Sequence, residues 1–138
     1  MLHTREPAVA GAFYPADSEV LHQQLTDMLD RAPFQGTHPK AIIVPHAGYI
    51  YSGQLAAKAY ASLQAQREKI KTVVLLGPAH TVYFSGIAAP ADDEFRTPLG
   101  TIPIDQQAIE GLVEKLEFVQ RLPQPHRDEH CLEAVSYT

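Results

Sequence analysis

The stretch "AIIVPHAGYIYSGQLAAKAYASLQ", residues 41–64, together with "TVVLLGPAH", residues 72–80, decides the fold. Its first run, 41–44, is continuous, apolar and partly β-branched, as is typical of a strand buried on both faces. Ser52 then caps a predicted helix whose small alanines permit close packing on a sheet. The run 72–77 predicts the next strand. Strand, helix and strand in this order predict a right-handed βαβ unit with parallel strands.

The flanking segments extend this α/β pattern. Asp17 or Ser18 caps a predicted helix with an apolar face, and Asp105 caps another. The residues of the first face are Leu21, Leu25, Met28 and Leu29, and those of the second are Ile109, Leu112, Val113 and Leu116. "GIAAP", 86–90, is compatible with a strand, and "FRTPLGTIPID", 95–105, predicts a hairpin around 98–100. The expected class is α/β, with a mostly parallel sheet.

Composition limits the possible functions. The 138 residues, 45% of them hydrophobic, suit one globular domain spanning 1–138. The net charge is −5 and there is no basic run, which argues against nucleic acid or a membrane surface as a partner. We find neither a signal-peptide pattern nor an apolar stretch of about 18 residues. A single cysteine, Cys131, agrees with a reducing compartment, so a cytoplasmic protein is predicted.

Two histidines each follow one of the predicted strands. His46 comes after Pro45, and His80 lies in "GPAH", 77–80. Because parallel strands end at the same edge of a sheet, the two imidazoles are expected to converge in the crevice where α/β proteins bind ligands. Imidazole binds Zn, Fe, Cu or Ni, so a metal site is one interpretation. The other is that each histidine simply forms a hydrogen bond in its loop.

A second group of polar residues is "PHRDEHCLE", 125–133. His126 and His130 are four residues apart, so on a helix they share a face, and with Glu129 they fit the H-x-x-E-H pattern of inverted zinc peptidases. Such a peptidase needs a further carboxylate ligand downstream, and Glu133 lies too near to serve comfortably. The alternative is a solvated, charged helix start after Pro125.

Five motifs carry a family resemblance. "REPAVAGAFYP" (5–15), "IIVPHAGYIYSGQLAAKAY" (42–60), "TVVLLGPAH" (72–80), "FRTPLGTIPID" (95–105) and "HRDEHCLEA" (126–134) occur in the order and spacing typical of the Memo family, also called protein B of the AmmeMemoRadiSam system. The resemblance covers nearly the whole chain and about the N-terminal half of a usual member. It implies a three-layer α/β fold, a mostly parallel sheet with helices on both faces, similar to that of class III extradiol dioxygenases, which use non-haem Fe(II).

The resemblance also implies roles for individual residues. His46 and His80 fall on metal-ligand positions, with Fe the first expectation for the metal and Zn or Cu the alternatives. Glu129 and His130 fall near the pocket as catalytic candidates, and His130 or another histidine would move protons. Tyr49 and Tyr51 could shape the substrate pocket, with simple packing as the alternative.

The end of the sequence departs from the family pattern. After Glu133 the family continues into a second half that supplies a cysteine ligand and a further histidine, whereas this sequence reads "AVSYT" and stops. We therefore expect a truncated domain, weak metal binding and self-association through uncovered apolar surface.

Three functions follow. A dioxygenase-like enzyme, completed by a C-terminal half or a partner chain, is favoured. A non-catalytic adaptor that binds phosphorylated or other peptides is the main alternative, and a zinc peptidase is less favoured. The small-molecule or peptide substrate is not specified by the sequence.

Overall fold

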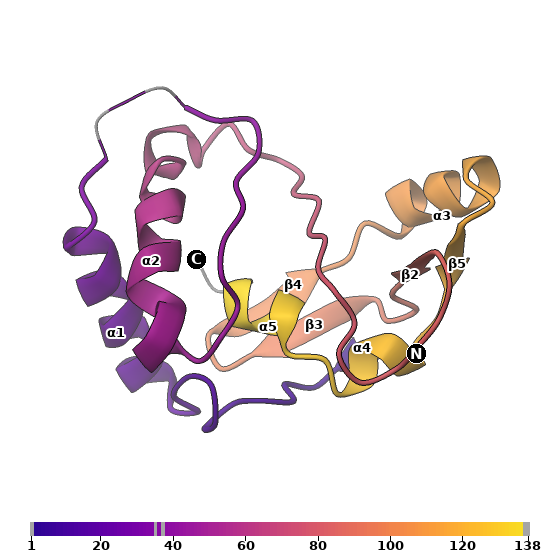
Figure 1. The fold of residues 1–138 in the computed structure, drawn as a ribbon, viewed down its shortest axis with the longest axis horizontal. Helices are drawn as coiled ribbons and strands as arrows, with labels where there is room; N and C mark the ends of the chain where they lie inside the picture. Colours follow the sequence, from indigo (N-terminus) through magenta and orange to yellow (C-terminus); the bar gives the residue numbers. More distant parts are fainter. Residues whose placement is uncertain (1, 35, 37, 137–138) are drawn as a thin grey trace.

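The computed structural model describes residues 2–34, 36 and 38–136. Two helices, α1 (Ser18–Asp30) and α2 (Tyr49–Ala61), lie side by side at one end of the molecule (Figure 1). The Asp17 side chain caps α1 by accepting hydrogen bonds from the backbone N–H groups of Glu19 and Val20, as predicted. Between the helices lies the main apolar core, formed by Tyr14, Leu21, Leu25, Tyr49, Ala32, Ala57 and Ala61.

The described residues also form five short strands. They are β1 (Thr4–Arg5), β2 (Ile87–Ala89), β3 (Glu94–Thr97), β4 (Gly100–Pro103) and β5 (Val119–Arg121). The pairs β1–β3 and β2–β5 are parallel, and β3–β4 is the predicted antiparallel hairpin. Helices combined with mostly parallel pairing confirm the α/β class.

The remaining helices are η1 (Gln64–Gln66), α3 (Gln106–Lys115), α4 (Gln124–Arg127) and α5 (Cys131–Val135). The predicted Asp105 cap of α3 is confirmed, because its carboxylate accepts a hydrogen bond from Ala108 N at 2.9 Å. The helix α3 lies with β2 and β5 at the end of the molecule opposite α1 and α2, and α5 lies between these ends (Figure 1). Within the described residues, none of the helices is long and apolar enough to cross a bilayer.

The two strands predicted at 41–44 and 72–77 are wrong. Neither segment has assigned secondary structure, and within the described part of the chain neither pairs with a strand. Their apolar side chains face solvent, since Ile43 is 100% exposed and Val74 is 76% exposed. A run that is apolar on both faces needs a layer on each side, and the described residues do not supply one. The βαβ unit is therefore not formed.

The start of α2 also differs from the prediction. The helix begins at Tyr49 with Gly48 as its N-cap, three residues before Ser52. The Ser52 hydroxyl lies inside the first turn and donates to Ala47 O at 3.1 Å. A serine in the first turn can bond backward in this way without being the cap.

Candidate metal centre

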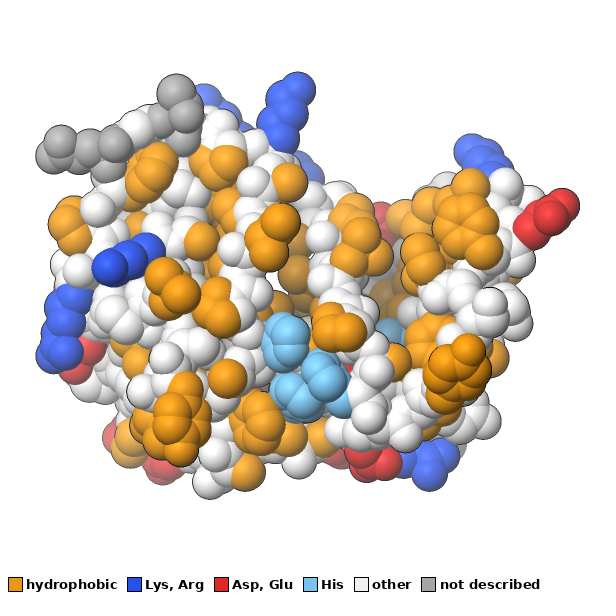
Figure 2. Space-filling view, viewed as in Figure 1, with side chains coloured by type: hydrophobic (Ala, Val, Ile, Leu, Met, Phe, Trp, Pro, Cys, Tyr) orange, Lys and Arg blue, Asp and Glu red, His pale blue; other side chains and the backbone are white. Residues whose placement is uncertain are grey.

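Three histidine side chains meet on one face of the molecule. The ring centroids of His46 and His80 are 5.2 Å apart, those of His46 and His130 are 5.6 Å apart, and those of His80 and His130 are 4.4 Å apart. Figure 2 shows histidine side chains gathered near the centre of this face with hydrophobic side chains around them. The predicted proximity of His46 and His80 is confirmed, and His130 joins them.

The loop that carries His46 is held by the N-terminal segment. Tyr49 N, at the start of α2, donates a hydrogen bond to Phe13 O at 2.8 Å. The Phe13 ring also contacts the His130 ring, with 4.8 Å between their centroids. Phe13 therefore helps to set where two of the three histidines lie.

The loop that carries His80 docks against the start of α5. Cys131 Sγ donates to Pro78 O at 3.0 Å. A Cβ atom added to Gly77 would lie only 2.7 Å from Cys131 Sγ, so this close approach requires glycine. The sequence "GPAH" thus places its histidine through contacts with α5 and not through the end of a paired strand.

Glu129 joins the same loop to α5. Its Oε2 accepts from His80 N at 2.6 Å, and its Oε1 lies 2.7 Å from His80 Nδ1. Oε1 also accepts from His130 N at 2.9 Å and Cys131 N at 3.2 Å. Burial alone would raise the pKa of Glu129, but these hydrogen bonds outweigh it and lower the pKa to about 2.

Arg5 and Glu133 form a buried ion pair, with 2.7 Å between Arg5 Nη1 and Glu133 Oε2. Arg5 also donates to His126 O and Glu129 O, both at 2.6 Å. The Glu133 carboxylate accepts further hydrogen bonds from the backbone N–H groups of residues 8 and 9 and from the Tyr14 hydroxyl. This network fastens the N-terminal segment to the segment that carries His130. The sequence motifs contain both residues but indicate no ion pair between them, because Glu6, Arg127, Asp128 and Glu129 lie in the same motifs and are equally charged.

The protonation of the site suits imidazole ligands. Burial lowers the pKa of His130, and the nearby Glu129 carboxylate opposes this only in part, so the neutral ring is favoured. Burial and the charge of Glu129 raise the pKa of Cys131 to about 11, so its sulfur stays a thiol at neutral pH.

Two donor groups in the described residues could hold a metal ion. One is His46, His80 and His130, and the other is His80, Glu129 and Cys131; within each group the donor atoms lie within 4.8 Å of one another. In the second group the carboxylate oxygens already accept three backbone N–H bonds. The histidine group is therefore the better candidate. Each ligand nitrogen lies about 2.1 Å from its metal ion, so a shared ion would hold the three nitrogens within about 4.2 Å of one another.

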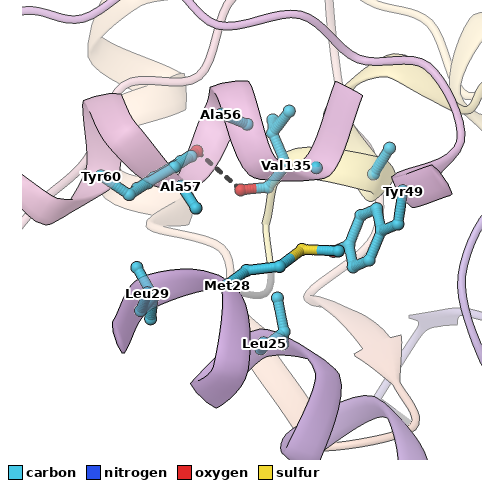
Figure 3. Close-up of a pocket in the computed structure, with 10 residues that line it drawn as sticks. Leu25, Met28, Leu29, Tyr49, Ala56, Ala57, Tyr60 and Val135 are labelled. Carbon is cyan, nitrogen blue, oxygen red and sulfur yellow. Dashed lines mark hydrogen bonds between the residues drawn. The ribbon is translucent and has the colours of Figure 1, made fainter. Parts of the chain in front are cut away.

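The two tyrosines predicted to shape the substrate pocket, Tyr49 and Tyr51, differ in their surroundings. Tyr49 is buried between α1 and α2, where its ring lies beside Leu25 and Met28 (Figure 3). The space there is about 10 Å³, room for roughly one water and not for a substrate. Tyr51, in the first turn of α2, is 83% exposed. Packing, the alternative interpretation, describes Tyr49.

The zinc-peptidase interpretation of "HRDEH" is wrong. His126 lies in α4, and His130 is the residue before α5, so the two histidines do not share the face of one helix. His126 is buried, and its Nε2 donates to Ala88 O at 3.0 Å because a carbonyl can only accept. That bond engages the Nε2 atom of His126 with the backbone and not with His130.

Comparison with known proteins identifies the family. A family model described as "Memo-like protein" matches residues 5–136. The chain belongs to the Memo-like family. A MEMO1 family protein of Aquifex aeolicus is 39% identical over 132 residues, covering 96% of this chain and 48% of that protein. The MEMO1 family protein Mbar_A1422 of Methanosarcina barkeri is 39% identical over 129 residues, covering 94% of this chain and 46% of that protein.

An animal relative is also similar. The "Protein memo-1 homolog" of Caenorhabditis elegans is 39% identical over 132 residues, covering 95% of this chain and 37% of that protein. This Memo-like chain therefore spans about half the length, or less, of these relatives.

Proposed function

We propose that this Memo-like chain holds a divalent first-row metal between His46, His80 and His130 and contributes to a dioxygenase-like oxidation at that centre. The supporting observation is that the donor atoms of these three imidazoles lie within 4.8 Å of one another. Imidazole nitrogens suit Fe, Zn and Cu, and the Memo resemblance favours Fe. Bound Fe(II) would supply the redox chemistry for reaction of an aromatic diol with O₂. A cytoplasmic location agrees with the single free cysteine.

The chain's own residues would hold and orient the metal and shape its surroundings. His130 becomes a third ligand in this proposal and no longer the proton carrier expected from the sequence, because its ring lies only 4.4 Å from that of His80. Three nitrogens from one chain would bind more tightly than the two-histidine site first expected. They would leave coordination positions open, which catalysis at a metal requires.

Oxygen uptake tests the function. Protein loaded with Fe(II) under anaerobic conditions is mixed with catechol and O₂, and uptake is followed with an oxygen electrode. We expect uptake that needs both the iron and the protein and that disappears in His80→Ala. The exposed His22→Ala variant on α1 serves as the control, because His22 lies outside the histidine cluster. Stoichiometric metal with no uptake would contradict the oxidation and favour a non-catalytic peptide-binding module.

We also expect this chain to self-associate in solution. The segments 41–46 and 72–79 lie outside the described strands and expose the large apolar side chains of Ile43, Val73, Val74 and Leu76. Exposed apolar side chains on backbone that is not paired in a sheet favour association with another chain. The relatives are about twice as long, which agrees with a surface that further polypeptide covers. A second copy is the occupant that this chain itself can supply.

Light scattering during size-exclusion chromatography measures the association. We expect a dimer or larger species at high micromolar concentration. The double substitution Val74→Glu with Leu76→Glu, in segment 72–79, should convert the associated protein to monomer. Val20→Glu, at an exposed position on α1, should leave the association unchanged. A wild-type chain that stays monomeric would contradict this expectation.

A further inference from the structure

The Glu129 carboxylate contacts both the backbone and the ring of His80. Oε2 accepts the backbone N–H of His80 at 2.6 Å, and Oε1 faces the ring nitrogen Nδ1 at 2.7 Å. Oε1 is also surrounded by the N–H groups of His130 and Cys131. The hydrogen bonds to this carboxylate lower its pKa to about 2, so it is ionised at neutral pH and can only accept; the hydrogen of this contact therefore lies on Nδ1.

We propose that Glu129 is a positioning residue that keeps His80 in the tautomer with its hydrogen on Nδ1, so that Nε2 is the nitrogen that binds metal. This inference rests on the proposed metal centre and specifies its geometry. A ring nitrogen that donates to a carboxylate fixes which nitrogen of a metal-binding histidine carries the lone pair, and it makes that nitrogen more basic. The catalytic role first expected for Glu129 is thereby replaced, because its two oxygens are engaged with protein donors.

Glu129 is itself held in place. Glu129 is only 5% exposed, and its backbone carbonyl accepts a hydrogen bond from Arg5 Nη2 at 2.6 Å. Arg5 is fixed in turn by its ion pair with Glu133. The carboxylate therefore cannot swing out to solvent without disturbing a buried network, and a rigid support of this kind is what a well-oriented ligand needs.

His126 provides an internal reference with the opposite tautomer. Its Nε2 donates to Ala88 O at 3.0 Å, so its hydrogen lies on Nε2. This bond joins α4 to β2 and depends on the fold and not on Glu129. One spectrum can therefore report both the tautomer of His80 and whether the protein is folded.

The test uses metal-free protein labelled with ¹⁵N-histidine. Long-range ¹H–¹⁵N correlation at about pH 8, above the ordinary histidine pKa of about 6.5, distinguishes the two tautomers. We expect His80 protonated on Nδ1 and His126 protonated on Nε2. In Glu129→Ala, His80 should lose the single Nδ1–H form while His126 is unchanged. A wild-type His80 protonated on Nε2 overturns the proposal, whether or not Glu129→Ala folds.

Zn²⁺ affinity provides the second readout. Glu129→Ala should weaken Zn²⁺ binding by about 10–100-fold, the usual effect of losing the hydrogen-bond partner of a ligand. Glu114→Ala, at an exposed position of α3, is the matched control and should leave the affinity unchanged. Equal affinity in folded Glu129→Ala would overturn the positioning role. Wild-type protein with the expected tautomer but no Zn²⁺ binding would instead overturn the proposed metal centre.

Discussion

Replacing Glu133 by glutamine is expected to lower the free energy of unfolding by about 3–5 kcal/mol, because it leaves the buried Arg5 guanidinium without its ionic partner. The Glu133 side chain is 2% exposed and lies 2.7 Å from Arg5 Nη1. It also accepts the backbone N–H groups of Ala8 and Val9, and a glutamine can present only one oxygen to these donors. Ordinary domains are stable by only about 5–15 kcal/mol, so much of the stability would be lost.

Urea denaturation at neutral pH measures this loss. The matched control is Glu110→Gln, which removes the partner of Arg121 in a pair of similar length, 2.9 Å, at an exposed position. Exposed pairs contribute about 0–1 kcal/mol, so the control should unfold close to the wild type. Equal midpoints for the two variants would show that the Arg5–Glu133 pair does not hold the segments together.

The second large effect is on metal affinity. Changing His46, His80 or His130 singly to alanine is expected to weaken Fe(II) or Zn²⁺ binding by roughly 100-fold or more, beyond the about 10–100-fold loss for a residue that only orients a ligand. Each substitution leaves two imidazoles, which hold a first-row metal weakly and without selectivity. Competition with a coloured chelator under anaerobic conditions gives the dissociation constants.

The pattern among the variants distinguishes the ligand sets. The exposed His22→Ala variant should bind as the wild type does. If His130→Ala also bound normally while His46→Ala and His80→Ala did not, His130 would not be a ligand. Circular dichroism of each variant separates lost ligation from lost structure.

Local signals in the sequence predicted the local structure well. The Asp17 and Asp105 caps and the hairpin at β3–β4 depend on side chains and turns a few residues apart, and all three are confirmed. The runs 41–44 and 72–77 were assigned as strands because they are apolar, yet a strand also needs a neighbour to pair with. Whether a neighbour lies alongside is a tertiary property that hydrophobic pattern does not contain.

The candidate site shows the same division. The proximity of His46 and His80 was predicted from parallel strand ends, and the proximity is confirmed although those strands are not formed. The histidines are brought together instead by hydrogen bonds from Tyr49 N to Phe13 O and from His80 N to the Glu129 carboxylate. Each of these bonds joins residues that are at least 36 positions apart in the sequence. Contacts between residues so far apart leave no periodic pattern in the sequence. The ion pair between Arg5 and Glu133 could not be predicted for the same reason.

The tie between Arg5 and residues 126–133 also constrains when the protein can finish folding during synthesis. The acceptors of Arg5 are made 121–128 residues after it. At about 5–20 residues per second, a ribosome takes roughly 6–26 s to cover that distance. The α1–α2 pair can assemble early from neighbouring sequence, but β1 must wait for β3 and the guanidinium must wait longer still. Residues 4–5 are therefore made well before their partners and are among the last to reach their native position.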